Sequence, residues 1–281
     1  MTAPATLAER LGFRPDERLL IVNCDDLGSS HSANVAIEEC LTQGVATSAT
    51  MMVPCPWAFE AAQTLKGRDI GVHLTLTAEY PRYRWRSLTG AAALHDADGF
   101  LPRTAGEVFA KASLEDARAE CRAQIDQALA WGVDITHLDS HMGTVQTDPR
   151  FFALYVELAA EYDLPLRMVG QAGERMLGFS SREPAAERGL VFTDHFLSPT
   201  WGVQTREVIL RTLPKLRPGV TEVYLHPVVD GPELRACDEE AGDVRSSDYA
   251  LLMDTVLRAL IDAEGIRLIS FRPLRDLQRA A

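Results

Sequence analysis

Seven residues of types that bind metal ions or transfer protons follow apolar stretches of this chain. They are Asp25, Asp26, His73, His137, Asp139, His141 and His226. Each lies within or just beyond the C-terminal part of an expected strand. Aspartate and histidine hold divalent ions and act as general bases and acids near neutral pH. If the strands form a parallel β/α barrel, their C-terminal ends meet on one face, so the sequence predicts an active site there.

Three of these residues are spaced two apart. His137, Asp139 and His141 lie in the segment 134–141, which reads DITHLDSH. In an extended chain, side chains two positions apart lie on the same face. Two imidazoles and a carboxylate on one face could hold a divalent metal ion. A polar strand end that hydrogen-bonds to a neighbouring loop explains the spacing equally well, so the triplet alone leaves both interpretations open.

Two further histidines lie in strand-like segments. His73 belongs to GVHLTLT, in which Gly71 permits a close approach of the backbone, and His226 precedes Pro227 after the apolar VYL. A single histidine in a strand is more often a hydrogen-bonded structural residue than part of a site. Neither histidine therefore identifies a site without the others.

Asp25 and Asp26 end the apolar stretch LLIVNCDD. The structural interpretation is a turn or a helix cap, because aspartate is common in both. The functional interpretation divides their roles, so that one carboxylate ligates a metal and the other acts as a general base on a bound water. Adjacent carboxylates repel each other, and we expect the positive charge of a metal to keep both ionised.

Strand-like and helical segments alternate about seven times along the chain. Strands are expected at 19–23, 45–53, 69–76, 134–141, 166–169, 221–227 and 266–271, and helices at 33–41, 57–66, 113–131, 149–162, 203–213 and 248–263. Such alternation favours a parallel sheet covered by helices. We predict an α/β protein, a distorted (β/α) barrel of about seven units that forms a single domain over residues 1–281. The long irregular stretches at 78–105 and 170–200 are expected to form a lid or rim.

Composition narrows the class of protein. With 281 residues, 46% hydrophobic and 24% charged, the chain is typical of a soluble globular protein with a sizeable core. A net charge of −12 disfavours nucleic acid and anionic membranes as partners. The five cysteines show no CxxC spacing, which predicts reduced thiols and a cytoplasmic location. We expect no signal peptide, no membrane span and no glycine-rich nucleotide loop.

Five motifs carry a family resemblance. LLIVNCDDLG, GVATSATMMV, GVHLTLT, THLDSH and LHP occur in this order from about residue 18 to residue 227. Their order and spacing resemble the YdjC/ChbG-like carbohydrate deacetylases. The resemblance implies a polysaccharide-deacetylase-like barrel and a hydrolase that releases acetate from an N-acetylated amino sugar or short oligosaccharide. It also implies a divalent metal ion, Zn²⁺ or Mg²⁺, and a homodimer.

The resemblance assigns roles to five of the seven residues. Position by position, it makes Asp26, His73 and His141 the metal ligands. Asp25 would be the general base and His226 the general acid. Two neutral imidazoles and one carboxylate leave open positions on the ion for water and substrate, so the assignment agrees with the chemistry of catalytic metal sites.

The same resemblance makes His137 and Asp139 residues that orient His141 or the site. Where the family commonly continues HLDSHHHVH, this chain reads HLDSHMGTVQ. His141 is therefore retained, whereas the additional histidines are replaced by Met142, Gly143, Thr144 and Gln146. We expect these replacements to alter contacts with the sugar rather than the chemistry of hydrolysis.

Two other functions fit the same residues. A site of two histidines and one carboxylate could hold Fe(II) and carry out oxygen chemistry, although the adjacent aspartate base argues against it. A relative that kept the site and lost turnover would be a sugar-binding or regulatory protein. Four aromatic residues are candidates for stacking on a sugar, with a place in the core as the alternative: Trp57, Tyr80, Tyr83 and Trp85.

Overall fold

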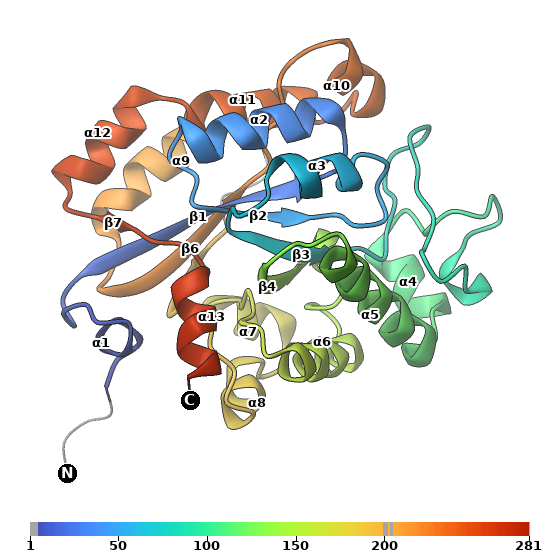
Figure 1. Cartoon of the computed structure of the whole chain (residues 1–281), viewed down its shortest axis with the longest axis horizontal. Helices are drawn as coiled ribbons and strands as arrows, with labels where there is room; N and C mark the ends of the chain where they lie inside the picture. The colour runs from blue at the N-terminus through green and yellow to red at the C-terminus, as the bar shows by residue number, and fades with distance from the viewer. Residues whose placement is uncertain (1–4, 199–201, 203–204, 281) are drawn as a thin grey trace.

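The computed structural model describes residues 5–198, 202 and 205–280, and it confirms the predicted α/β barrel (Figure 1). The strands are β1 (Arg18–Leu27), β2 (Ser48–Met51), β3 (Ile70–Leu74), β4 (Ile135–Ser140), β5 (His195–Leu197), β6 (Gly219–Leu225) and β7 (Arg267–Leu268). Their hydrogen-bonded order is β4-β3-β2-β1-β6-β5, and β7 pairs with the first part of β1. All of these pairs are parallel.

The barrel is irregular between β4 and β5. Leu138 of β4 pairs with Leu166, and Leu166 pairs with Phe192, which lies shortly before β5. The strand expected at 166–169 is therefore reduced to a single bridging residue. Arg167 follows this bridge, and its backbone N–H donates to the Leu138 carbonyl at 2.9 Å. The weakly paired segment thus carries a charged side chain into the barrel.

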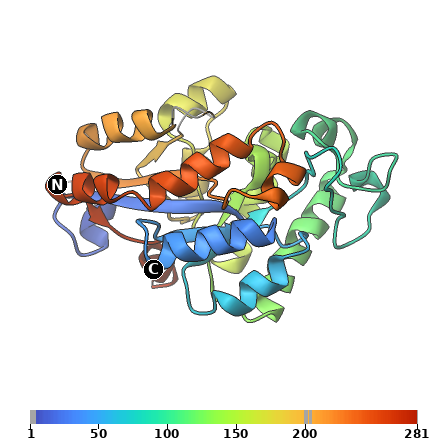
Figure 2. The ribbon, with the colours of Figure 1, turned by 90° about the horizontal axis from the view of Figure 1, so that it is seen from above.

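Helices cover the outside of the sheet. They are α1 (Leu7–Arg10), α2 (His31–Thr42), α3 (Ala58–Thr64), α4 (Ala105–Lys111), α5 (Leu114–Ala130), α6 (Pro149–Tyr162), α7 (Gln171–Leu177), α8 (Arg182–Glu187), α9 (Thr205–Thr212), α10 (Pro232–Cys237), α11 (Gly242–Leu252), α12 (Thr255–Ala263) and α13 (Arg272–Arg279). Figure 2 shows α2 and α11 side by side, and α5 packs against α6 on the other side of the barrel. As predicted, Ser113 begins α5, because its Oγ accepts a hydrogen bond from the Asp116 N–H at 3.0 Å.

Some expected elements differ from the structure. The helix expected at 248–263 is two helices, because Asp254 caps a new one by accepting from the Val256 N–H at 2.8 Å. The irregular region 170–200 contains α7, α8 and β5, with 199 and 200 outside the described residues. Likewise, the helix expected at 203–213 is observed from Thr205, since 203 and 204 lie outside the described part. Helices α1, α4, α10 and α13 were not predicted either.

The cysteines and the helices bear on two further expectations, reduced thiols and the lack of a membrane span. The five cysteines are free thiols, and four of them are buried. Among the helices that the structure describes, none is long and apolar enough to cross a membrane.

Successive side chains of β1 point alternately to the outside and to the inside of the barrel, where they join two different hydrophobic clusters. Leu20, Val22 and Cys24 point outward into the main core beneath the helices. Leu19 and Ile21 belong instead to a small apolar cluster with residues of β6 and the C-terminal segment. This second cluster fills the N-terminal end of the barrel with apolar side chains.

A hydrogen-bonded polar layer lies between the apolar cluster and the open end. The Asn23 amide donates to Asp25 Oδ1 at 2.8 Å and to Thr50 Oγ1 at 3.0 Å. Thr50 in turn donates to Asp139 Oδ2 at 2.8 Å, and Ser48 donates to Asn23 at 2.7 Å. Buried polar groups are stable when they are paired in this way. The layer therefore holds Asp25 and Asp139 in fixed positions.

The ring of His137 leaves no room for a side chain at position 71 of β3, which is a glycine. A Cβ at Gly71 would lie 2.6 Å from His137 Cε1 and 2.7 Å from the His137 carbonyl oxygen. We therefore expect Gly71→Ala to lower the free energy of unfolding by about 1–3 kcal/mol through overpacking. Urea denaturation measures this change.

The matched control is Gly106→Ala in α4, where an added Cβ meets nothing within 4 Å. This substitution should raise the free energy of unfolding by up to about 1 kcal/mol, because alanine favours helix more than glycine does. Equal effects of the two substitutions would contradict a steric requirement at Gly71.

Candidate active site

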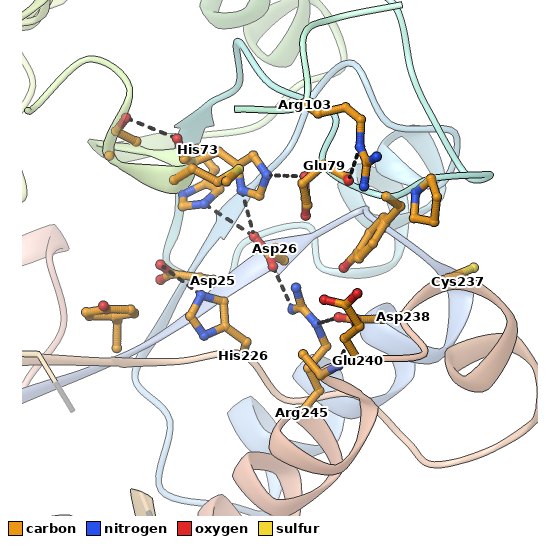
Figure 3. Close-up of a pocket in the computed structure, with 18 of the residues that line it drawn as sticks. Asp25, Asp26, His73, Glu79, Arg103, His226, Cys237, Asp238, Glu240 and Arg245 are labelled. Atoms are coloured by element: carbon orange, nitrogen blue, oxygen red, sulfur yellow. Dashed lines mark hydrogen bonds and ion pairs between the residues drawn. The ribbon is translucent and has the colours of Figure 1, made fainter. Parts of the chain in front are cut away.

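A cavity of about 790 Å³ opens at the C-terminal ends of the strands (Figure 3). Five residues predicted as ligands or catalytic groups line it: Asp25, Asp26, His73, His141 and His226. Its volume falls in the range that small-molecule sites occupy. The structure thus brings together five of the seven residues chosen from the sequence, drawn from β1, β3, the end of β4 and the end of β6.

An irregularity in β1 turns both aspartates toward the cavity. In a regular strand, adjacent side chains point to opposite faces. The pairing of β1 with β2 shifts register between Cys24 and Leu27, and Asp26 adopts φ 67° within this shift. Aspartate enters the left-handed region more readily than most residues. The bulge therefore explains how two neighbours in sequence share one site.

Asp26, His73 and His141 form a candidate metal site, with one donor atom from each lying within 4.8 Å of the others. Asp26 Oδ1 lies 3.3 Å from His73 Nε2 and 3.3 Å from His141 Nδ1. Among the described residues, this buried oxygen has no hydrogen-bond partner. A buried carboxylate oxygen that accepts no hydrogen bond and lies close to two imidazole nitrogens fits a divalent cation.

The other nitrogen of each imidazole contacts a carboxylate. His73 Nδ1 lies 2.5 Å from Asp139 Oδ1, and His141 Nε2 lies 2.9 Å from Glu79 Oε2. Burial alone would lower the pKa of both histidines. The surrounding carboxylates, Asp139 and Glu79 foremost, instead raise the pKa of His73 to about 10 and that of His141 to about 9. The site therefore favours positive charge, whether as protons or as a bound cation.

The two remaining predicted residues lie deeper in the barrel. Asp139 contacts the site through His73 rather than through His141. His137 stacks on Phe271 with 3.7 Å between ring centroids, and its Nδ1 lies 3.0 Å from Thr136 Oγ1. These contacts lie at the apolar end of the barrel, and the expected role of His137 in orienting His141 or the site stays a prediction. Burial also lowers the pKa of His137 well below its usual value.

Arg167 lies among three buried carboxylates. Its guanidinium donates to Asp25 Oδ2 at 2.6 Å and to Asp25 Oδ1 at 2.7 Å. It also lies 2.8 Å from Asp139 Oδ2 and donates to Glu222 Oε1 at 2.7 Å. Burial would raise the pKa of Asp25, but the guanidinium outweighs it and lowers that pKa to about 2. Asp25 is therefore ionised at neutral pH and held in one orientation.

A second buried arginine pairs with Asp26. Arg245 Nη1 donates to Asp26 Oδ2 at 2.7 Å, and its Nε donates to Asp238 Oδ2 at 2.7 Å (Figure 3). Burial would raise the pKa of Asp26, but Arg245 and the two imidazoles lower it well below its usual value. Each adjacent aspartate thus has its own arginine, so the two guanidinium groups supply positive charge that the sequence analysis expected from a metal.

His226 follows β6 and faces Asp25. Its Nε2 lies 4.0 Å from Asp25 Oδ2, and its backbone N–H donates to Asp248 Oδ2 at 2.9 Å. Burial lowers the pKa of His226 to about 4. The imidazole is therefore neutral at neutral pH in the free protein, and it must gain a proton before it can act as an acid.

Of the four aromatic residues considered for sugar stacking, Tyr80 lines the cavity. Trp85 is buried in a side cluster with Tyr80 and Tyr83, and Trp57 lies against His31 with 4.8 Å between ring centroids. The cavity wall gains two other aromatic residues, Phe196 and Tyr224, whose rings stack 5.5 Å apart.

Four charged residues of the site escaped prediction from the sequence. Arg167 in the short apolar run PLRMV and Glu222 in TEVYLHP were detectable in principle, because a charged residue in a buried strand needs a partner. Glu79 belongs to a long loop and Arg245 to a polar helix. Nothing in their local sequence distinguishes these two from surface charges.

Comparison with known proteins gives one family. The profile of the family described as YdjC-like protein matches residues 19–263. A protein of Thermus thermophilus named carbohydrate deacetylase is 34% identical, covering 91% of this chain and 93% of that protein. A Geobacillus stearothermophilus protein of the same name is 32% identical, covering 92% and 99%. The crystal structure of an Enterococcus faecalis protein named for cellobiose-phosphate cleavage shares the fold, with TM-score 0.79, 24% identity and coverage of 92% and 99%.

Glu222 should make stability depend on pH. Burial raises its pKa from 4.5 to about 7, despite the opposing charge of Arg167. A carboxyl whose pKa is raised on folding destabilises the fold when it ionises, so the penalty is absent below pH 4.5 and complete above about pH 7. Glu222→Gln removes this penalty. The free energy of unfolding of the variant, relative to the unaltered protein, should rise by about 3 kcal/mol across this range. A difference independent of pH in urea titrations would contradict this account.

Proposed function

This chain belongs to the YdjC-like family, and on that basis we propose that it is a carbohydrate deacetylase acting on an N-acetylated amino sugar or short oligosaccharide. The observation that carries the proposal is that Oδ1 of Asp26 accepts no hydrogen bond and lies 3.3 Å from a nitrogen of His73 and of His141, with Asp25 and His226 beside it. Similarity to proteins named carbohydrate deacetylase along nine-tenths of the chain supports it.

The cofactor of the proposed enzyme is a divalent ion, Zn²⁺ or Mg²⁺. Asp26, His73 and His141 would hold it, and the two imidazoles favour zinc. When bound, such an ion polarises an acetyl carbonyl and lowers the pKa of a water molecule. Arg245 engages Asp26 Oδ2, which leaves Oδ1 as the oxygen that is available for coordination.

Asp25 is the proposed general base. Arg167 donates to both of its oxygens and Asn23 donates to Oδ1 as well, so Oδ2 is the oxygen that retains an acceptor position for water. These hydrogen bonds fix the direction of the free lone pair of Oδ2. Because the pKa of Asp25 is about 2, the group is ready to accept a proton at neutral pH but is a weak base. It therefore needs a water molecule that is already acidified.

His226 is the proposed general acid, and its proton must arrive during turnover. The water oxygen bonds to the acetyl carbon while Asp25 takes one water proton. Asp25 Oδ2 lies 4.0 Å from His226 Nε2, which is too far for a direct hydrogen bond, so this proton passes to the neutral imidazole through one bridging water molecule. The C–N bond then breaks as His226 protonates the leaving amine. Acetic acid, which loses its remaining proton to solvent, and a free amino sugar are the products, and both residues return to their starting states.

Acetate release from a panel of N-acetylated sugars, with metal-free protein and added Zn²⁺, Mg²⁺ or Co²⁺, tests the proposal. Asp25→Asn should retain metal binding and lower kcat by about 10²-fold or more, because it removes the base. Asp26→Ala should lose both metal binding and activity. If the unaltered protein bound no metal and Asp26→Ala kept full activity, the proposal would be wrong.

The other outcomes of this assay identify the alternatives. Tight sugar binding without acetate release indicates a sugar-binding or regulatory protein. Consumption of O₂ by the Fe(II)-loaded protein indicates oxygen chemistry. A homodimer, a cytoplasmic location and a single domain over residues 1–281 stay predictions, and light scattering measures the first of them.

A further inference from the structure

Glu79 connects the candidate metal site to the long segment between β3 and α4, here called the 78–104 loop. This loop stands at the open end of the barrel (Figure 1), and Glu79 reaches from it into the cavity (Figure 3). Its Oε2 lies 2.9 Å from Nε2 of His141, whose Nδ1 faces Asp26. The loop therefore touches a proposed ligand through one carboxylate.

The two ligand histidines are supported differently. The partner of His73 is Asp139, which is fully buried on β4 and is also held by Thr50. The partner of His141 is Glu79, whose side chain is 21% exposed and belongs to no strand or helix. The sheet thus fixes one imidazole, whereas a loop fixes the other.

The 78–104 loop is tied to the barrel at defined points. Arg103 Nε donates to the Glu79 carbonyl at 3.0 Å, which holds the start of the loop against its end. The buried carboxylate of Glu120 on α5 accepts from the N–H groups of Leu88 at 3.0 Å and Thr89 at 2.9 Å. The 78–104 loop is therefore held in a defined conformation by hydrogen bonds. The direction of the Glu79 carboxylate depends on that conformation.

We propose that Glu79 is a positioning residue that sets the metal affinity of the site and couples metal binding to the 78–104 loop. The inference rests on the proposed metal site and extends it. A carboxylate on the distal nitrogen of a ligating imidazole fixes the ring and makes the ligating nitrogen more basic. Because coupling between two sites is reciprocal, an ion that favours oriented His141 also stabilises the loop that orients it.

Metal affinity of the substrate-free protein tests the first half of the proposal. Zn²⁺ and Co²⁺ are titrated into metal-free protein against a chromophoric chelator. Glu79→Ala should weaken binding by about 10–100-fold, the usual effect of losing such a partner. Glu79→Gln should weaken it less, because its amide oxygen still accepts a hydrogen bond from the imidazole N–H.

Glu240→Ala is the matched control, since Glu240 also lines the cavity and its loss removes the same charge. Its effect on affinity should be within about threefold, because an exposed charge that touches no ligand is screened by solvent. If Glu79→Ala and Glu240→Ala weakened metal binding equally, the effect of Glu79 would be that of any negative charge near the cavity. This result would overturn the proposal. Unchanged affinity in Glu79→Ala would overturn it as well.

Amide hydrogen exchange tests the second half. Adding metal should slow exchange at residues 78–85 in the unaltered protein, and Glu79→Ala should abolish this slowing at saturating metal. Equal slowing in both proteins, or no slowing in the unaltered one, rules out coupling through Glu79.

Failure of the inference and failure of the proposed function give different results. If the unaltered protein and Asp26→Ala bind metal with equal affinity, the metal site is elsewhere. The proposed role of Glu79 is then wrong as well. If the unaltered protein binds metal through Asp26 but releases acetate from no sugar, the proposed function fails. In that case, the affinity and exchange results still decide the role of Glu79.

Discussion

Three buried carboxylates meet at the single guanidinium of Arg167, and the rest of the site depends on this arrangement. Asp25, Asp139 and Glu222 come from different strands and would repel one another in a low-dielectric interior without it. The arginine orients the proposed base directly and supports His73 through Asp139. Removing one partner from a buried pair commonly costs about 3–5 kcal/mol, so the same interaction maintains both fold and chemistry.

The barrel accommodates this charge by separating its interior into layers. Apolar residues close the N-terminal end, and hydrogen-bonded Asn23, Ser48 and Thr50 form the middle. The proposed metal ligands and proton-transferring groups lie at the open end. Because outward side chains of the same strands supply the main hydrophobic core, the interior can be polar without loss of the burial that stabilises the fold.

The residues of the site come from two kinds of element, the strands of the barrel and the segments outside it. Asp25, His73 and Asp139 are held by strands and by each other. Glu79 belongs to the 78–104 loop and contacts the proposed ligand His141. Arg245 belongs to the outer helix α11 and contacts the proposed ligand Asp26. Under the proposed function, the sheet would carry the groups that do the chemistry, and a loop and an outer helix would tune the affinity for the ion.

The sequence by itself determined the parallel β/α architecture and seven candidate residues at strand ends, because apolar strand runs and the residues that end them are local features. The family resemblance then singled out five of the seven: Asp25, Asp26, His73, His141 and His226. The sequence did not determine what neutralises the aspartates. The pairs Arg167–Asp25 and Arg245–Asp26 join residues 142 and 219 positions apart, and Glu79–His141 spans 62. Only the tertiary structure decided these contacts, because they depend on the bulge at Asp26, on an irregular barrel edge at Leu166 and on the path of a long loop. No local pattern encodes where such charges meet.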